Sequence, residues 1–117
     1  MTPPARDREH LRVLHADPYH ATRWEGAQDG ASISVIVSRN DPGPVTSMHR
    51  HPYDETWVVQ AGRITFYAGG DSVQVGPGDI VNVPADTPHK FTNDGPGRCH
   101  LLCIHPSPTI IEERVPE

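Results

Sequence analysis

Short stretches of alternating apolar and polar residues run along the chain. The alternation is clear in residues 32–39 (SISVIVSR), 55–60 (ETWVVQ) and 99–105 (CHLLCIH). A period of two is the repeat of a β-strand, because successive side chains point to opposite faces of a sheet. No window of ten or more residues has the apolar stripe of an amphipathic helix. The pattern therefore predicts an all-β chain.

About ten short strands or strand pieces are predicted, with turn residues between them. They cover residues 10–15, 23–27, 32–39, 45–51, 55–60, 64–68, 73–75, 80–83, 89–93 and 99–105. The 117 residues include 13 Pro and 10 Gly, which suit the intervening turns. Short strands at this spacing are typical of a sandwich or barrel. We expect one domain over residues 10–117, ending in a C-terminal tail and preceded by a flexible segment of residues 1–9.

The phase of residues 32–39 predicts an inward apolar stripe. Ile33, Val35 and Val37 share one face, and the serines of this stretch lie opposite. Arg39 continues the apolar face at the strand end. It is therefore either a solvated strand-end residue or a partner for a substrate carboxylate at the mouth of the barrel.

Three histidines and one carboxylate carry the strongest chemical signal. His49 and His51 are two residues apart, so a strand projects both to one face. Glu55 opens the next predicted strand after a short turn, and His89 is the best-placed fourth ligand by type. Neutral imidazoles and a carboxylate suit first-row divalent metals. We interpret these residues as one metal site.

Two motifs in these segments resemble those of the cupin family. From Gly43 the sequence runs Gly, five residues, His, one, His, three, Glu, six, Gly. From Gly78 it runs Gly, five residues, Pro, one, Asp86, two, His, three, Asn. The family pattern has Gly at the position of Asp86, and we expect the turn to survive because Asp adopts left-handed conformations at modest cost.

The resemblance implies a cupin-type jelly-roll β-barrel. It also implies that the four residues bind a divalent transition metal, one of Fe, Mn, Ni, Zn or Cu. The implied ligands are His49, His51, Glu55 and His89. Cupins differ widely in chemistry, so the family does not determine the reaction.

A small, mostly apolar pocket is expected beside the metal. Trp57 shares the phase of Glu55, and Phe91 shares that of His89. Tyr53 lies next to the ligands in sequence. His105 shares the inward phase of the last strand, where it is either a base beside the metal or a histidine that caps the strand end. Pockets of this kind hold a compact ligand and orient it with few polar groups.

Three functions remain open. The first is a metal-dependent enzyme, a dioxygenase, isomerase or lyase acting on a small carbonyl or carboxylate compound. The second is a non-catalytic module that holds a metal and a small ligand. The third is a structural barrel in which the metal only stabilises the fold. No Ser-His-Asp set or activated thiol is evident, which argues against covalent catalysis.

Net charge and composition limit the kinds of binding partner that are expected. The formal net charge is −5 and basic residues do not cluster, which argues against nucleic acids and anionic membranes. No apolar run approaches the ~20 residues of a membrane span, and the polar start lacks the features of a secretory signal, so a cytoplasmic protein is expected.

Cys99 and Cys103 would lie about 13 Å apart in one strand, too far for a disulfide.

A homodimer is also expected. Cupins often pair, and the sequence suggests an outer apolar sheet face through Val58, Ile64 and Phe66. Such a face would be buried when two copies associate.

Overall fold

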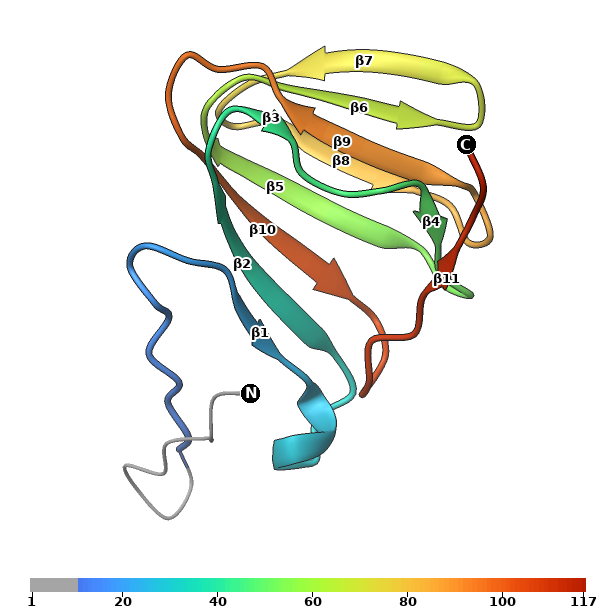
Figure 1. The fold of residues 1–117 in the computed structure, drawn as a ribbon. Helices are drawn as coiled ribbons and strands as arrows, with labels where there is room; N and C mark the ends of the chain where they lie inside the picture. The colour runs from blue at the N-terminus through green and yellow to red at the C-terminus, as the bar shows by residue number, and fades with distance from the viewer. Residues whose placement is uncertain (1–10) are drawn as a thin grey trace.

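Two antiparallel β-sheets pack against each other in the computed structural model, which describes residues 11–117 (Figure 1). The five-stranded sheet has the order β1 (Thr22–Trp24), β2 (Ser34–Asn40), β10 (Cys99–His105), β5 (Glu55–Ala61) and β8 (Ile80–Val83). The second sheet has the order β11 (Glu113–Arg114), β4 (His49–Arg50), β9 (His89–Asn93), β6 (Ile64–Ala68) and β7 (Asp71–Val75), and β3 (Gly43–Pro44) pairs with β9. A short 3-10 helix, η1 (Gly26–Asp29), joins β1 to β2.

Most strand pairs join segments that are distant in sequence. Only β1 with β2 and β6 with β7 pair as consecutive strands among the described residues. The chain passes repeatedly from one sheet to the other, which is the connectivity of a jelly roll. The predicted all-β jelly-roll fold is confirmed.

An aromatic cluster fills the space between the sheets. The ring centroids of Trp57 and Phe66 lie 4.9 Å apart, and those of Phe66 and Phe91 lie 5.2 Å apart. These rings are buried together with Leu101 and Cys103. Burial alternates along β5, β9 and β10, so the predicted phases of these three strands are confirmed.

The predicted phase of β2 is wrong. Ser34 and Ser38 are 0% and 5% exposed, whereas Ile33 is 42% exposed. Ser34 is accommodated in the interior because its hydroxyl donates to the Ser107 carbonyl at 2.7 Å and accepts from the Gly26 amide at 3.2 Å. Burying a hydroxyl costs little free energy when it both donates and accepts a hydrogen bond. A prediction from hydrophobicity alone therefore assigned the wrong face of β2 to the interior.

The reversed phase of β2 also changes the position of Arg39. It is on the outer face of β2, where its guanidinium donates to the Asp17 carbonyl at 2.9 Å. The structure therefore gives it the role of a surface residue that fastens the segment before β1.

Some predicted strand limits are also wrong. Of residues 10–15, the described part is irregular apart from an isolated bridge at Val13. The strand predicted at residues 23–27 ends at Trp24, and η1 follows. Residues 45–51 are not one strand: from Pro44 to His49 the chain advances five residues while its partner β9 advances three, from Thr92 to His89. The extra residues bulge out of the ladder.

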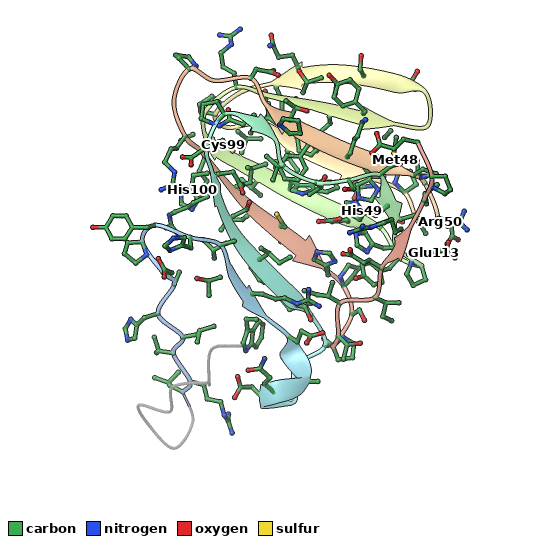
Figure 2. All side chains as sticks on the ribbon, viewed as in Figure 1. Met48, His49, Arg50, Cys99, His100 and Glu113 are labelled. Atoms are coloured by element: carbon green, nitrogen blue, oxygen red, sulfur yellow. The ribbon has the colours of Figure 1, made fainter. Side chains whose placement is uncertain are left out.

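The short strand β4 connects two elements of the second sheet. Its inner residue His49 pairs with His89 of β9 on one side and with Arg114 of β11 on the other. Arg50 pairs with Glu113, and the two side chains form an ion pair (Figure 2).

The outer apolar face that was expected to support a homodimer is not present as predicted. Ile64 and Phe66 are buried in the core, at 0% and 2% exposure, so they form no outer apolar face. The homodimer stays a prediction, because only the frequent pairing of cupins now supports it.

The flexible segment predicted at residues 1–9 lies outside the described residues.

Both cysteines are buried and unpaired, as predicted. Burial raises the pKa of Cys99 and raises that of Cys103 further, which keeps both thiols protonated and unreactive. Within residues 11–117, the structure contains no helix with the length and apolar character needed to cross a membrane.

Asp86 adopts the left-handed conformation expected of it, with φ of 62°. Its amide donates to the His51 carbonyl at 2.7 Å, which fastens the loop before β9 to the segment after β4. Asp is one of the few residues with a side chain that tolerates this backbone region. The replacement of the motif glycine therefore preserves the turn.

Asp86 provides a test of this turn. We expect Asp86→Ala to lower the free energy of unfolding by about 1 kcal/mol, because Ala pays more for a left-handed backbone. Asp86→Gly should keep or slightly raise stability. Urea unfolding measures both, with the exposed strand residue Asp71→Ala as the control. Equal stability of the Ala and Gly variants would contradict this account.

Candidate metal centre

The four predicted ligands meet at one end of the barrel. His49 lies on β4, His51 directly follows it, Glu55 begins β5 and His89 begins β9. Each offers a ligand atom, and these atoms all lie within 4.8 Å of one another. Three of the residues are buried, and His49 is partly exposed. Because Glu55 belongs to one sheet and His49 and His89 to the other, the cluster forms only when the sheets pack.

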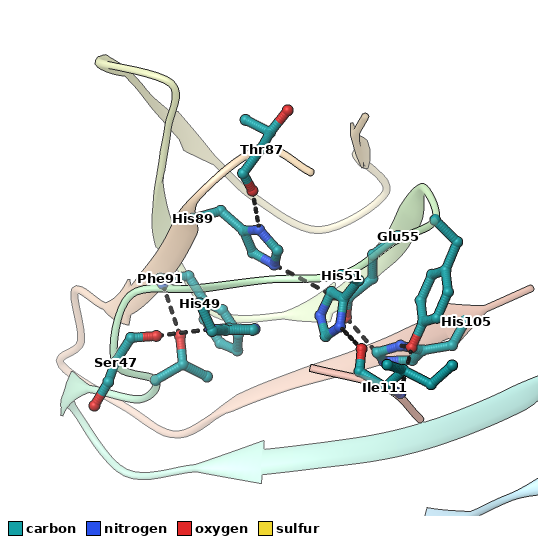
Figure 3. Close-up of polar contacts among 11 residues, drawn as sticks. Ser47, His49, His51, Glu55, Thr87, His89, Phe91, His105 and Ile111 are labelled. Atoms are coloured by element: carbon teal, nitrogen blue, oxygen red, sulfur yellow. Dashed lines mark hydrogen bonds and ion pairs between the residues drawn. The ribbon is translucent and has the colours of Figure 1, made fainter. Parts of the chain in front are cut away.

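Backbone carbonyls orient the three imidazoles (Figure 3). The Nδ1–carbonyl pairs are His49 with Ser47 at 2.7 Å, His51 with Ile111 at 2.7 Å and His89 with Thr87 at 2.8 Å. A carbonyl only accepts, so Nδ1 of each ring carries the hydrogen. Nε2 of each neutral ring is then a lone pair aimed at the cluster, the form in which histidine binds metals.

Glu55 stands at the centre of the cluster. Its Oε1 lies 2.8 Å from Nε2 of His51 and 3.3 Å from Nε2 of His89. Nε2 of His51 is buried without a hydrogen-bond partner. Two buried acceptor atoms at this separation are unfavourable unless a positive charge, from a proton or a metal ion, lies between them. The donor set therefore fits a divalent metal ion.

The pKa values reflect this concentration of charge. Burial raises the pKa of Glu55, but three imidazoles, His105 foremost, outweigh burial and hold the pKa well below the usual carboxyl range. Burial lowers the pKa of His51, but the Glu55 carboxylate and the Ile111 carbonyl together outweigh burial and produce a net rise. Burial lowers the pKa of His49. Glu55 is therefore an ionised carboxylate that attracts cations.

His105 is a further histidine of the site. It is buried, and its Nε2 lies 3.1 Å from Oε2 of Glu55. Its Nδ1 lies 2.8 Å from the Tyr53 hydroxyl, which accepts from the Ile111 amide at 3.1 Å. If Tyr53 donates to Nδ1, the hydrogen of His105 is on Nε2 and faces Glu55. In that tautomer, opposite to that of His49, His51 and His89, His105 holds Oε2 of Glu55. Its Nε2, like that of His51, has no other hydrogen-bond partner among the described residues.

A cavity of about 390 Å³ adjoins the cluster. Trp57, Phe91 and His105, which the sequence placed in the pocket, all line it. Tyr53 does not line it but stacks on His51, with ring centroids 5.2 Å apart and planes 6° apart. Arg39 is absent from the lining, because its strand face points outward.

Some lining residues were not predicted. Glu112 and Arg114 come from the C-terminal segment, and Ser38 and Asn40 come from the corrected face of β2. Residues 110–115 (IIEERV) show no alternation of apolar and polar residues, and a two-residue strand gives too short a pattern to reveal its inner face.

A family model described as a Cupin domain matches residues 37–105, more than half of the chain. The chain belongs to the cupin family. The match includes all four candidate ligands and His105, and it ends before the C-terminal segment.

Two curated relatives align with this cupin. An uncharacterized protein of Streptomyces coelicolor is 33% identical over 89 residues, covering 69% of the chain and 83% of that protein. Quercetin 2,3-dioxygenase of Bacillus subtilis is 30% identical over 84 residues, covering 71% of the chain. The alignment covers only 25% of the dioxygenase, so this relative is a much longer protein.

Solved structures share the cupin fold at low identity. A cupin protein from Bacteroides fragilis has a TM-score of 0.75 at 13% identity, covering 92% of this chain and 93% of its own. Oxalate decarboxylase of Bacillus subtilis has a TM-score of 0.73 at 17% identity, covering 81% of this chain but 27% of its own. At these identities the likeness concerns the fold alone.

Loss of one imidazole should empty the site of this cupin without unfolding it. We expect His49→Ala and His89→Ala to lower the affinity for divalent metals by about 100-fold or more, beyond the effect usual for residues that only support a ligand. Calorimetric titration with Mn²⁺ or Zn²⁺ measures the affinity, and circular dichroism checks the fold. The exposed His15→Ala is the matched control. Unaltered affinity in either ligand variant would contradict the assignment.

His105 should affect the metal through Glu55. We expect His105→Phe to weaken metal binding about 10- to 100-fold, because Oε2 of Glu55 loses its partner. Tyr53→Phe removes one hydroxyl but keeps the imidazole, so its effect should be smaller. Competition with a chromophoric chelator measures both. If His105→Phe bound metal as tightly as the wild type, His105 would have no positioning role.

Proposed function

We propose that this cupin is a metal-dependent enzyme acting on a small carbonyl or carboxylate compound. A divalent transition metal would be held by His49, His51, Glu55 and His89. The observation that carries the proposal is the convergence of three oriented imidazoles and an ionised carboxylate beside an internal cavity. The identity of the metal is left to experiment.

The cavity favours a catalytic site over a structural one. Structural zinc sites are closed, with four protein ligands in a tetrahedron. Here the cluster lines a cavity large enough for a compact ligand, and His49 is partly exposed within it. A metal held there would supply Lewis acidity or adjacent positions for substrate and O₂.

The protein contributes orientation and a partly apolar cavity. Three carbonyls fix the imidazole tautomers, and His105 restrains one oxygen of Glu55. Trp57 and Phe91 form part of the cavity wall, which limits water near the reacting groups. Exclusion of water strengthens every electrostatic interaction inside such a site.

Among the reaction classes, oxygen-dependent oxidation has the most support. The relative at 30% identity is named a dioxygenase, whereas the neighbour named a decarboxylase is 17% identical. Both are longer than this chain, and one fold hosts many activities, so isomerase or lyase chemistry remains the alternative within the proposal.

Metal analysis followed by O₂ uptake tests the function. Purified protein should contain close to one transition metal per chain, and one member of a panel of quercetin, oxalate and 2-oxo acids should cause O₂ consumption. His89→Ala should abolish uptake, and His15→Ala should not.

The other outcomes separate the alternatives. Product formation without O₂ uptake would indicate a lyase or isomerase. Ligand binding without turnover would indicate a non-catalytic module. Tightly held zinc with no exchangeable water ligand would contradict the catalytic proposal.

A further inference from the structure

The C-terminal segment brings charged side chains to the cavity. In β11, Arg114 pairs with His49, and on the other side of β4 His49 pairs with His89. Residues directly opposite in an antiparallel ladder have their side chains on the same face. Arg114, His49 and His89 therefore form a row across the inner face of the second sheet. Glu112 and Arg114 both line the metal cavity, in agreement with this register.

The neighbouring residues face the opposite way. Glu113 and Arg50 are paired in the register, and their side chains form an ion pair on the outside of the barrel (Figure 2). This outward pair agrees with the phase of β11 in the ladder, since a slip by one residue would exchange the inner and outer faces. The ladder therefore places Arg114 on the cavity side of β11, at the solvent-exposed rim of the cavity.

Arg114 lacks an internal partner within residues 11–117. Other arginines are engaged: Arg50 with Glu113, Arg39 with the Asp17 carbonyl and Arg98 with Asp41. The backbone of Arg114 pairs with His49 in the ladder, but its side chain makes no hydrogen bond or ion pair with residues 11–117. An arginine without a partner at a cavity wall has its planar set of donors free for a carboxylate.

The charge balance of the cavity selects the ligand. Glu112 offsets Arg114, and Glu55 offsets half of a divalent cation, so the loaded cavity keeps one positive charge. One positive charge favours a monoanion over a neutral molecule, and an additional negative charge on the ligand would face Glu112. Of the Lys and Arg in residues 11–117, Arg114 lines the cavity.

We propose that Arg114 binds the carboxylate of a small monoanionic acid in the metal cavity. This inference rests on the proposed function, because it requires the metal to balance Glu55. It names the substrate class as small monocarboxylates. It also places the recognition residue in the C-terminal segment rather than at Arg39.

Acetate and acetamide are matched probes, since they have nearly the same shape and differ in charge. Protein loaded with Mn²⁺ is titrated with each by calorimetry, and water proton relaxation reports access to the Mn²⁺. Acetate should bind more tightly than acetamide. Arg114→Gln should weaken acetate about 10-fold or more, the size expected for a charge-assisted hydrogen bond, and should leave acetamide unchanged.

Further variants separate the contributions of charge, donor geometry and location in the cavity to acetate binding. Arg114→Lys should retain part of the acetate affinity, because it keeps the charge but loses the planar donor pair. Glu112→Gln should strengthen acetate binding a few-fold by removing a like charge. Arg39→Gln removes an arginine outside the cavity and should have no effect. The affinity for Mn²⁺ is measured for each variant and should stay within a few-fold of the wild type.

The outcomes separate this inference from the proposed function. If the wild type bound no transition metal, both would be overturned. If Mn²⁺ bound normally but acetate affinity were the same in wild type and Arg114→Gln, only the role of Arg114 would be overturned. The same would follow if wild-type protein with Mn²⁺ bound no acetate, or if Arg39→Gln weakened acetate as much as Arg114→Gln.

Discussion

The Glu55 carboxylate is the constraint on which the rest of the site depends. It is buried, ionised and surrounded by imidazole nitrogens of His51, His89 and His105 within 3.3 Å. A buried carboxylate is costly unless positive charge and hydrogen bonds compensate it. Carbonyl contacts of His51 and His89 and the Tyr53 contact of His105 turn these nitrogens toward the carboxylate. Fold and chemistry are therefore specified by the same contacts.

The jelly roll explains why the contacts arise only in the folded chain. Glu55 and His105 lie on adjacent strands of one sheet, β5 and β10, and His49 and His89 lie on β4 and β9 of the other. The aromatic cluster of Trp57, Phe66 and Phe91 holds the sheets together directly beneath the site. A change of sheet packing would move the carboxylate relative to the imidazoles, so the core sets the geometry of the cluster.

The sequence identified the four residues that cluster in the structure because their signals are local. The pair His49 and His51 needs only the period of a strand, and the two motifs are complete within short segments. The inner face of β2 was mispredicted because Ser34 is stabilised by Ser107, 73 residues away. Likewise, the position of His105 against Glu55 and the inward face of Arg114 follow from pairing between distant strands. Period and composition carry no information about such partners.

The segment after residue 105 lies beyond the match to the family model and still reaches the site. The family model ends at residue 105, yet the Ile111 carbonyl accepts from His51 and the Ile111 amide donates to Tyr53. Three residues later the same segment pairs with β4 and carries Arg114 to the cavity. The segment from Ile111 to Arg114 thus orients His51 and lines the cavity. The contacts that orient His51 and part of the cavity wall therefore come from a segment beyond the match to the family model.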